Sequence, residues 1–562
     1  MRRNGIARKC GIPLVTGAAV ALMCSVGGWT VAQGDEGANQ IVPAKLAVSE
    51  FARAIDDRLT VEIPGQPGAV PTPIIDDEAY LRRVSQDLIG ELPSPEEITA
   101  FVLDHSGDKR PKAVERLLAD PRYGENWGHY FRDVILYRRT DDRALRMGPA
   151  VDRYLAEQFN KGTGWDQIAR GFITAEGDIR DNGNTGLIMA QMGQAAEIAA
   201  ETARIFLGIQ IQCAQCHDHP TDRWKREQFH ELAAFFPRVA IRPVREGDKR
   251  VSFAIASRDA APRKVPKNAK AKNDPEHYMP DLKDPSAKGT LMAPVFFVSG
   301  QELPVGTKDA DRRQELANWI TSDSNPWFAR AFVNRIWAEL VGQGFYEPVD
   351  DLGPDRKPSA PQTLERLAKE FAGHGYDVKW LISTIMATET YQRETRSRHD
   401  DDATPFAASC PQPLRADQVF DAVAAALDID EGRFGPPGLD SAQRGLRGPR
   451  VEFSRTFGFD PSAPRDEVGA SIPQALLMMN SPMLNRAIAG GSASTMLGKL
   501  LADKADDETI ATELYLRCLA REPNPVELAT CLSYISSTNN QTEGFEDILW
   551  ALLNSTEFTH RK

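Results

Sequence analysis

Two cysteines, two histidines and an aspartate fall within seven consecutive positions of this chain, from Cys213 to His219. The run Cys213-Ala-Gln-Cys216-His217 is the C-x-x-C-H pattern of covalent haem attachment. Thiols at positions i and i+3 can reach the two vinyl groups of one porphyrin, and the adjoining histidine can bind the iron as its proximal ligand. The pattern therefore predicts haem c on Cys213, Cys216 and His217.

The same stretch permits two other interpretations. A bare metal ion such as zinc could bind Cys213, Cys216, His217 and His219, because thiolates and imidazoles are the usual zinc ligands. Four ligands in seven residues are crowded, and His230 from the next segment would relieve that strain. The two cysteines could instead form a redox pair or a structural disulfide, although no βαβ pattern of the thioredoxin kind surrounds them.

A haem at this position would raise the question of its sixth ligand. His219 is too close in sequence to the proximal histidine to reach the opposite face of the porphyrin. Met279 and Met292 lie in irregular segments that could fold over a haem, as does His277. Asp218 and His219 could orient the site, since a metal-bound histidine usually donates its second ring nitrogen to a neighbour, or they could form a polar turn that Pro220 closes. A filled sixth position favours electron transfer, and an open one favours small-ligand or peroxide chemistry.

Length and composition narrow the class of protein. A chain of 562 residues predicts two to four domains, and 41% apolar with 26% charged residues is ordinary for a packed soluble protein. The formal charge of −12 argues against a nucleic-acid partner, which requires a basic face. The sequence contains neither a Gly-rich phosphate loop nor a Gly-x-Ser-x-Gly elbow.

The N-terminus has the pattern of a secretory signal. Four positive charges precede an uncharged apolar run, which ends in small residues before a polar segment. The run is short and contains glycines, which disfavours a retained membrane span. We expect a signal peptide at residues 1–32, cleavage near Ala32, and export to the periplasm or cell envelope.

Removal of this segment leaves Cys213, Cys216, Cys410, Cys518 and Cys531. These are too few for a disulfide framework in so long a chain. Cys518 and Cys531 lie on successive helical stretches, where they could pair across a hairpin or be buried as small apolar residues.

The fold predicted from these patterns is mainly α, a multi-domain helical protein with a small β-containing insertion around residues 237–305. Apolar residues recur at helical spacing in residues 76–92, and Ser94 followed by Pro95 predicts the start of the next helix. Residues 195–212 are strongly helical in composition up to Cys213. Short strands are expected at residues 251–258 and 293–300. The predicted division is a signal peptide (1–32), a linker (33–75), a helical domain with the C-x-x-C-H motif (76–236), the β-containing insertion (237–305) and a helical C-terminal domain (306–562).

These motifs together resemble a known family. Its signature stretch corresponds to TARIFLGIQIQCAQCHDHPTDRWKREQFHELAAFF, and its opening to DDEAYLRRVSQDLIGELPSPEEITAF. The chain is similar here to the planctomycete cytochrome-c-like domain. Its second half resembles the uncharacterised domain that usually follows, through NPWFARAFVNRIWAELVGQGFYEPVDDLGPDRKPSAP and IPQALLMMNSP. The resemblance implies an envelope protein with haem at the C-x-x-C-H motif.

The second half contains one further charged constellation. Asn334-Arg335 and Asp350-Asp351 place a cation and carboxylates on neighbouring segments. They could form an active centre, but we favour a buried ion pair that ties a helix to a loop, because ion-pair networks resemble such sites. The function expected from the whole sequence is that of an exported c-type cytochrome-like protein that transfers electrons to a redox partner protein in the envelope. The alternative is a zinc-like Cys/His site that stabilises an envelope scaffold. No enzyme substrate is identifiable from the sequence.

Overall fold

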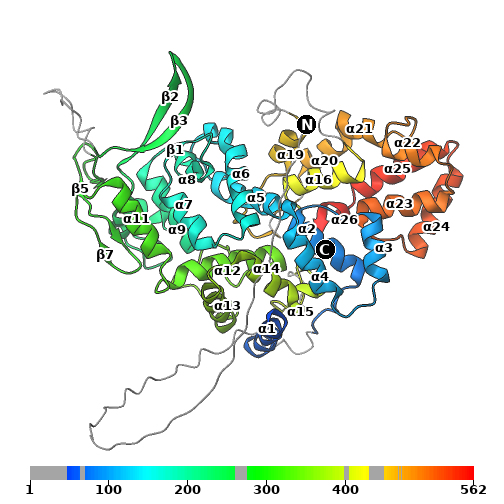
Figure 1. Ribbon diagram of the computed structural model, residues 1–562, viewed down its shortest axis with the longest axis horizontal. Coiled ribbons are helices and arrows are strands. Elements are labelled where there is room, and N and C mark those ends of the chain that lie inside the picture. Colours follow the sequence, from blue (N-terminus) through cyan, green and yellow to red (C-terminus); the bar gives the residue numbers. More distant parts are fainter. Residues whose placement is uncertain are drawn as a thin grey trace, which may run out of the picture. The chain divides into compact units, whose positions relative to one another are not determined.

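The computed structural model describes residues 47–63, 70–259, 275–397, 404–429, 448–465, 468–469 and 471–562. Helices dominate this part of the chain, and the sheets are small and antiparallel (Figure 1). The predicted mainly α fold is therefore confirmed. The predicted signal peptide at residues 1–32 lies outside the described residues.

The helices of the first half lead up to the C-x-x-C-H motif. They are α1 Val48–Glu62, α2 Asp77–Ile89, α3 Pro95–Leu103, α4 Lys109–Ala119, α5 Pro121–Leu136, α6 Gly148–Lys161, α7 Trp165–Ile173, α8 Gly186–Ala190, α9 Ala195–Leu207 and α10 Arg226–Ala233. Three short 3-10 turns accompany them, namely η1 Asp142–Met147, η2 Gly183–Thr185 and η3 Gln212–Gln215.

The strands lie mostly between residues 237 and 305. They are β1 Gly177–Asp178, β2 Val239–Glu246, β3 Lys249–Ser257, β4 Tyr278–Met279, β5 Thr290–Leu291, β6 Val295–Phe296 and β7 Gln301–Glu302, with β8 Gln412–Pro413 and β9 His560–Arg561 further on. The order β1-β3-β2 makes a three-stranded sheet, and β2 and β3 form a long projecting hairpin (Figure 1). The strand predicted at 251–258 corresponds to β3, whereas the segment 293–300 contains only the two residues of β6.

The helices of the second half form two groups. Those that pack with the first half are α11 Asp309–Ile320, α12 Pro326–Val341, α13 Pro361–Gly373, α14 Val378–Ala387 and α15 Glu389–Gln392. Those around the second core are α16 Ala416–Ala426, α19 Pro449–Phe457, α20 Ile472–Asn480, α21 Pro482–Ile488, α22 Met496–Ala502, α23 Asp507–Leu519, α24 Pro525–Ser537, α25 Gln541–Leu553 and α26 Thr556–Thr559.

Local chemistry explains why α3 begins where the sequence predicts. The Ser94 hydroxyl accepts a hydrogen bond from the Glu97 backbone N–H, and the Glu97 carboxylate accepts one from the Ser94 N–H. Pro95 fills the first helical position, where no N–H is needed. This capping box confirms Ser94 as the N-cap and Pro95 as the first helical residue.

The stretch predicted as a linker is partly a core element, which corrects that prediction. Helix α1 buries Phe51, Ile55 and Leu59, and these residues belong to the same hydrophobic cluster as α13 and α14. A spacing of four residues places all three on one face of the helix. The proline-rich segment after α1 hid this connection, because it separates the helix in sequence from the elements that it packs against.

A cluster of aromatic rings in stacked and tilted contacts joins the two halves of the chain. Trp165 of α7 lies 4.5 Å from Phe332 of α12, 4.8 Å from Phe131 of α5 and 5.9 Å from Phe206 of α9, measured between ring centroids. Aromatic rings in such contacts contribute stabilisation beyond their buried area. The first hydrophobic core is therefore shared by helices before and after the β-containing segment, while the second core gathers residues 414–558.

A buried ionic network reinforces the same junction. Arg204 on α9 pairs with Glu201 at 2.6 Å and with Asp350, which follows α12, at 2.9 Å. Arg335 of α12 contacts the same Asp350 oxygen at 3.3 Å, and Gln210 donates a hydrogen bond to the other oxygen at 3.0 Å. The predicted ion pair between Arg335 and Asp350 is thus confirmed, and Arg204 from the first half extends it.

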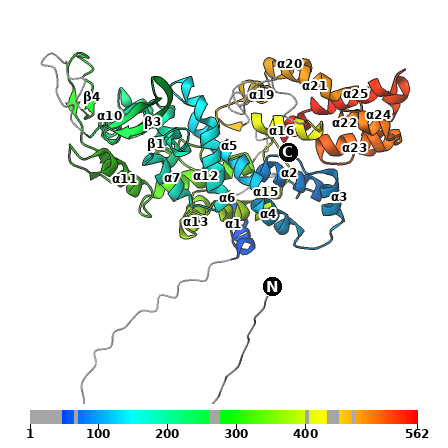
Figure 2. The ribbon, with the colours of Figure 1, turned by 45° about the horizontal axis from the view of Figure 1, so that its top comes forward.

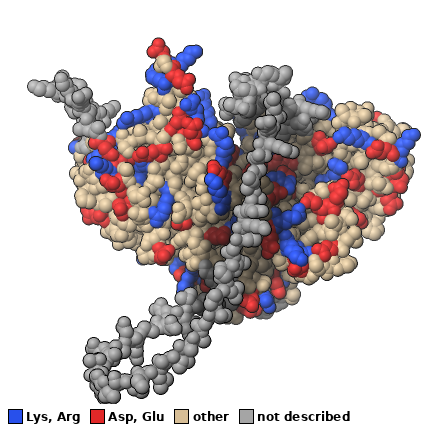
Figure 3. Space-filling view, viewed as in Figure 1, with Lys and Arg blue, Asp and Glu red and all other residues tan. Residues whose placement is uncertain are grey.

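Figure 3 shows lysine and arginine side chains interspersed with aspartate and glutamate on the face that it draws, without a continuous basic field. Among the described residues, each helix falls short of the length and apolar character that a membrane crossing requires.

Asp350 should be essential for stability. Burial by itself raises the pKa of Asp350, but the guanidinium groups of Arg204 and Arg335 outweigh it and hold the pKa below its usual value. Asp350→Ala would leave the two buried cations undercompensated, and we expect the free energy of unfolding to fall by about 3–5 kcal/mol. Urea denaturation followed by circular dichroism measures the loss. Asp355→Ala, at an exposed position nearby, is the control and should change it by less than about 0.5 kcal/mol; equal losses in the two variants would contradict the prediction.

Candidate functional site

Helix α9 leads to the C-x-x-C-H motif but ends before it. Its last residue is Leu207, and Gly208 adopts a left-handed conformation with φ of 64°. The N–H groups of Gly208 and Ile209 bond back to carbonyls of the last turn, which closes the helix. The expectation that the helix continues up to Cys213 is therefore wrong, because the glycine stops it five residues earlier.

Gly208 is also a point of close approach. The Leu352 N–H donates a 2.7 Å hydrogen bond to the Gly208 carbonyl. A Cβ at this position would lie 2.9 Å from a methyl carbon of Leu352 and 3.1 Å from Ala331. Both the backbone conformation and the lack of space require glycine here, and the result is that the segment before the motif rests on the loop that follows α12.

The first cysteine lies on a short 3-10 turn and the second follows it, and both are exposed to solvent. Residues Gln212–Gln215 form η3, which contains Cys213, and Cys216 follows directly. Ala214 between them and Ile211 before them are fully buried, whereas Cys213 and Cys216 are exposed and unpaired. The turn is thus anchored through its apolar residues and leaves its thiols accessible.

His217 is exposed, and its ring is oriented by the next peptide group. Its Nδ1 lies 2.7 Å from the Asp218 carbonyl oxygen. A carbonyl oxygen only accepts, so this hydrogen bond places the proton on Nδ1 and leaves the lone pair of Nε2 available to a metal. Asp218 therefore contacts the ring through its backbone.

The Asp218 carboxylate has a different role. It pairs with Lys225 at 2.8 Å and accepts a hydrogen bond from the Arg226 N–H at the start of α10. The Lys225 ammonium lowers the pKa of Asp218. His219 is half-buried, and its backbone N–H donates a hydrogen bond to the Trp224 carbonyl at 2.8 Å. Both residues thus close the loop between the motif and α10.

His230, a candidate metal ligand from the sequence, is engaged at both ring nitrogens. Its Nε2 donates to the Gln215 carbonyl at 3.1 Å, and its Nδ1 lies 2.9 Å from Nε2 of His277. Burial lowers the pKa of both rings, and that of His277 falls to about 4. Both are therefore neutral at pH 7, His277 donates to His230, and His230 holds the C-x-x-C turn by its backbone.

The methionines considered as sixth ligands lie on a small hairpin beside α10. Met279 is half-buried in β4, which pairs with β5, and Met292 follows β5 with its side chain 7% exposed. The Arg226 guanidinium donates to the Pro280 carbonyl at 2.6 Å, and Figure 2 shows β4 close to α10. The hairpin thus joins the motif to residues about 60 positions later in the sequence.

The segment after α12 borders the motif from the other side. A Cβ on Gly353 would collide with the Asp222 carboxylate, so the Asp222 side chain lies directly against the Gly353 backbone. Burial raises the pKa of Asp222, and the nearby carboxylates of Asp355 and Asp351 add to the effect. Arg356 pairs with Asp351 at 2.8 Å. The loop around the motif is therefore shaped by both halves of the chain.

The remaining cysteines are interior residues. Cys410, Cys518 and Cys531 are buried, and Cys518 and Cys531 are unpaired. The interpretation of these last two as buried small residues is therefore the one that holds. Within the described ranges, no three His, Cys, Asp or Glu side chains are grouped so as to hold a metal ion.

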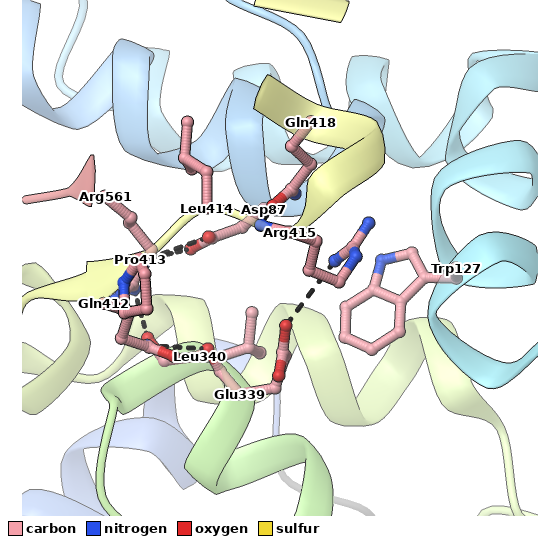
Figure 4. A pocket seen from close by; sticks show the side chains of 10 residues that line it. All are labelled: Asp87, Trp127, Glu339, Leu340, Gln412, Pro413, Leu414, Arg415, Gln418 and Arg561. Atoms are coloured by element: carbon pink, nitrogen blue, oxygen red, sulfur yellow. Dashed lines mark hydrogen bonds and ion pairs between the residues drawn. The ribbon is translucent and has the colours of Figure 1, made fainter. Parts of the chain in front are cut away.

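A small polar pocket lies between the two cores, away from the motif in sequence (Figure 4). Arg561 pairs with Asp87 at 2.8 Å, Arg415 faces Glu339 at 3.5 Å, and the indole nitrogen of Trp127 is buried without a partner. The space amounts to about 20 Å³, enough for one water molecule. We interpret the pocket as a structural contact between the two cores, held by these ion pairs.

Sequence reasoning missed the residues that position the motif. The Leu-Gly pair after an apolar helix is a usual stop signal and could have revealed the end of α9 at Gly208. Arg204 and Gln210 gave no such signal, because their partner Asp350 lies some 140 residues away.

Two family models match the chain. Residues 55–240 match PSCyt2 and residues 312–535 match PSD1, both described as proteins of unknown function (DUF1549 and DUF1553). The chain belongs to the planctomycete family that pairs these two domains in this order. Neither a curated protein nor a solved structure matches it. The gap between the two matches contains most of the β-containing segment.

The histidine pair should make stability depend on pH. An unfolded histidine has a pKa near 6.5, whereas that of folded His277 is about 4. As the pH falls through this window, the unfolded chain binds protons first, so the free energy of unfolding decreases; above about pH 7 both states are neutral and the effect vanishes. His277→Phe should make this decrease shallower, as measured by urea denaturation at successive pH values. His105→Phe, at an exposed position, should not, and the same slope in all three proteins would refute the prediction.

Thiol reactivity should separate the two groups of cysteines. Burial raises the pKa of Cys518 to about 12 and also raises that of Cys531, so neither forms the reactive thiolate readily. In protein produced without haem attachment, iodoacetamide at pH 8 should modify Cys213 and Cys216 first, and the buried cysteines only after denaturation. Peptide mass mapping identifies the modified sites. Modification of Cys518 in the folded protein at the rate of Cys213 would be inconsistent with this structure.

Proposed function

We propose that this protein is an exported c-type cytochrome-like redox protein that carries haem covalently on Cys213 and Cys216, with His217 as the proximal iron ligand. The single observation that carries the proposal is the form of the C-x-x-C-H loop. Two accessible thiols lie three residues apart, one on a 3-10 turn and one directly after it, and the following histidine is hydrogen-bonded so that Nε2 is available.

The residues fit the group in their chemistry. Attachment requires thiols that the haem and its attachment machinery can reach, and Cys213 and Cys216 are exposed. A proximal histidine typically donates its second nitrogen to a carbonyl or carboxylate, which raises its basicity as a ligand, and Asp218 provides the carbonyl. His230 fixes the position of the turn through Gln215. Haem, when bound, would supply a one-electron redox centre.

Exposure of the loop supports electron exchange with another protein. Cys213, Cys216, His217 and Asp218 are all exposed, so a redox partner in the periplasm or cell envelope would reach the site directly. The signal-like sequence of residues 1–32 supports export, and covalent haem attachment takes place in that compartment. Met279 and Met292 are the proposed sources of a sixth ligand, since their hairpin borders α10.

Covalent haem can be tested directly. The full chain is produced in a bacterial host with a haem-attachment system, and haem is detected by peroxidase staining after denaturing electrophoresis and by the absorption spectrum. We expect one covalent haem per chain, and its complete loss in Cys213→Ala/Cys216→Ala. Cys531→Ala, which removes a thiol remote from the motif in sequence, is the matched control and should retain the stain.

The alternative is a zinc-like site that stabilises an envelope scaffold, with ligands among Cys213, Cys216, His217 and His219. Absence of covalent haem together with one zinc ion per chain, measured by metal analysis, would overturn the cytochrome proposal in favour of this scaffold. Zinc that is lost in the double cysteine variant would assign the metal to the motif.

A further inference from the structure

A cleft of about 210 Å³ opens in the second core, separate from the C-x-x-C-H motif in sequence. One wall is a single face of α20, because Ser471, Gln474, Ala475 and Met478 follow the three- and four-residue spacing of a helix. The other walls come from the end of α19, from residues 413–414, and from the C-terminal segment 554–560.

The lining is apolar with a neutral polar edge. Its apolar members are Pro413, Leu414, Phe457, Phe459, Val468, Ala475 and Met478. Hydroxyl and amide groups complete it, those of Ser471, Gln474, Asn554, Thr556 and Thr559, with the ring of His560. An apolar body with a few convergent polar groups is the usual character of a small-molecule site.

The described lining of this cleft carries no formal charge at pH 7. None of the described lining residues is Lys, Arg, Asp or Glu. Burial lowers the pKa of His560, so this ring is neutral at pH 7. Arg465 stacks on Phe459 at 4.5 Å and pairs with Glu339, so its charge is already compensated. Among the described lining residues, an ionised ligand would lose its hydration without meeting a side chain of opposite charge, which is costly.

The volume of the cleft limits the size of the ligand that it can accept. An apolar cavity of about 150 Å³ is known to accept benzene, and this cleft is larger. The backbone around it is well tied, since the Leu414 N–H donates to the Thr559 carbonyl at 3.0 Å and Pro413 pairs with His560 across β8 and β9. These contacts hold two of the walls together, residues 413–414 and the C-terminal segment.

We propose that this cleft binds a small, neutral, predominantly apolar molecule, with an aromatic ring or branched apolar body and one hydrogen-bonding group. The apolar body lies against Phe457 and Met478, and the polar group meets the hydroxyl and amide edge. This site is independent of the proposed haem attachment.

Benzamide, a neutral aromatic amide, is a suitable probe, and benzoate is its charged counterpart of nearly equal size. Isothermal titration of the full chain should give saturable one-to-one binding of benzamide, with benzoate weaker by about tenfold or more. Ala475→Trp places a bulky ring in the cleft from an exposed helix position and should weaken benzamide binding by about tenfold or more while the melting temperature is preserved.

Leu476→Gln is the matched control, because Leu476 is 51% exposed on the adjacent face of α20 and does not line the cleft. Its benzamide affinity should equal that of the unmodified protein. Photolabelling with an azidobenzamide provides a readout that needs no variant, and the label should map to residues 471–478 or 554–560. Equal binding of benzoate, unchanged binding in Ala475→Trp, or a label elsewhere would overturn the proposal. An absence of benzamide binding would also overturn the proposal, and this includes the case in which a second copy of the chain covers α20.

Discussion

The contact between Arg204 and Asp350 is the constraint on which the candidate site depends. It joins the last turn of the helix before the motif to the loop after α12, and both side chains are almost entirely removed from solvent. A buried charge that loses its partner is costly, so neither element can shift alone. The neighbouring Gly208 can then rest directly against Leu352, and the C-x-x-C turn begins at a defined place on the surface. The PSD1 region thereby helps to shape a motif that belongs to the PSCyt2 region.

Around this contact, backbone groups do most of the positioning. Ala214 anchors the turn because its side chain is buried, and the His230 ring donates a hydrogen bond to the Gln215 carbonyl. The His217 ring is oriented by the peptide that follows it. The side chains of the motif are left available for chemistry because other atoms carry the structural role. Accessible side chains are what the proposed covalent attachment of haem requires.

Much of the helical fold was predictable because its signals are local. The Ser94 capping box, the apolar periodicity of α2 and the start of α12 after Asn325 each depend on residues a few positions apart. The β2–β3 hairpin was only half predicted, although Gly247-Asp248 is a favoured two-residue turn and Gly247 has the positive φ that such a turn requires. The alternating pattern of β2 is weak because most of that strand projects into solvent, so its residues are under no pressure to alternate.

The sequence by itself determined the mainly helical class, the spacing of Cys213, Cys216 and His217, and the family to which the chain belongs. Each of these depends on patterns of residues that are close together in the sequence. Only the tertiary structure decided which residues support the motif. Arg204 meets Asp350, and His230 meets His277, across tens to hundreds of positions. Packing of α9 against α12 brings the first pair together, and packing of α10 against the β4 hairpin brings the second. No local pattern encodes these pairings, because the free energy of burying a charge or a ring depends on which residues the rest of the chain places beside it.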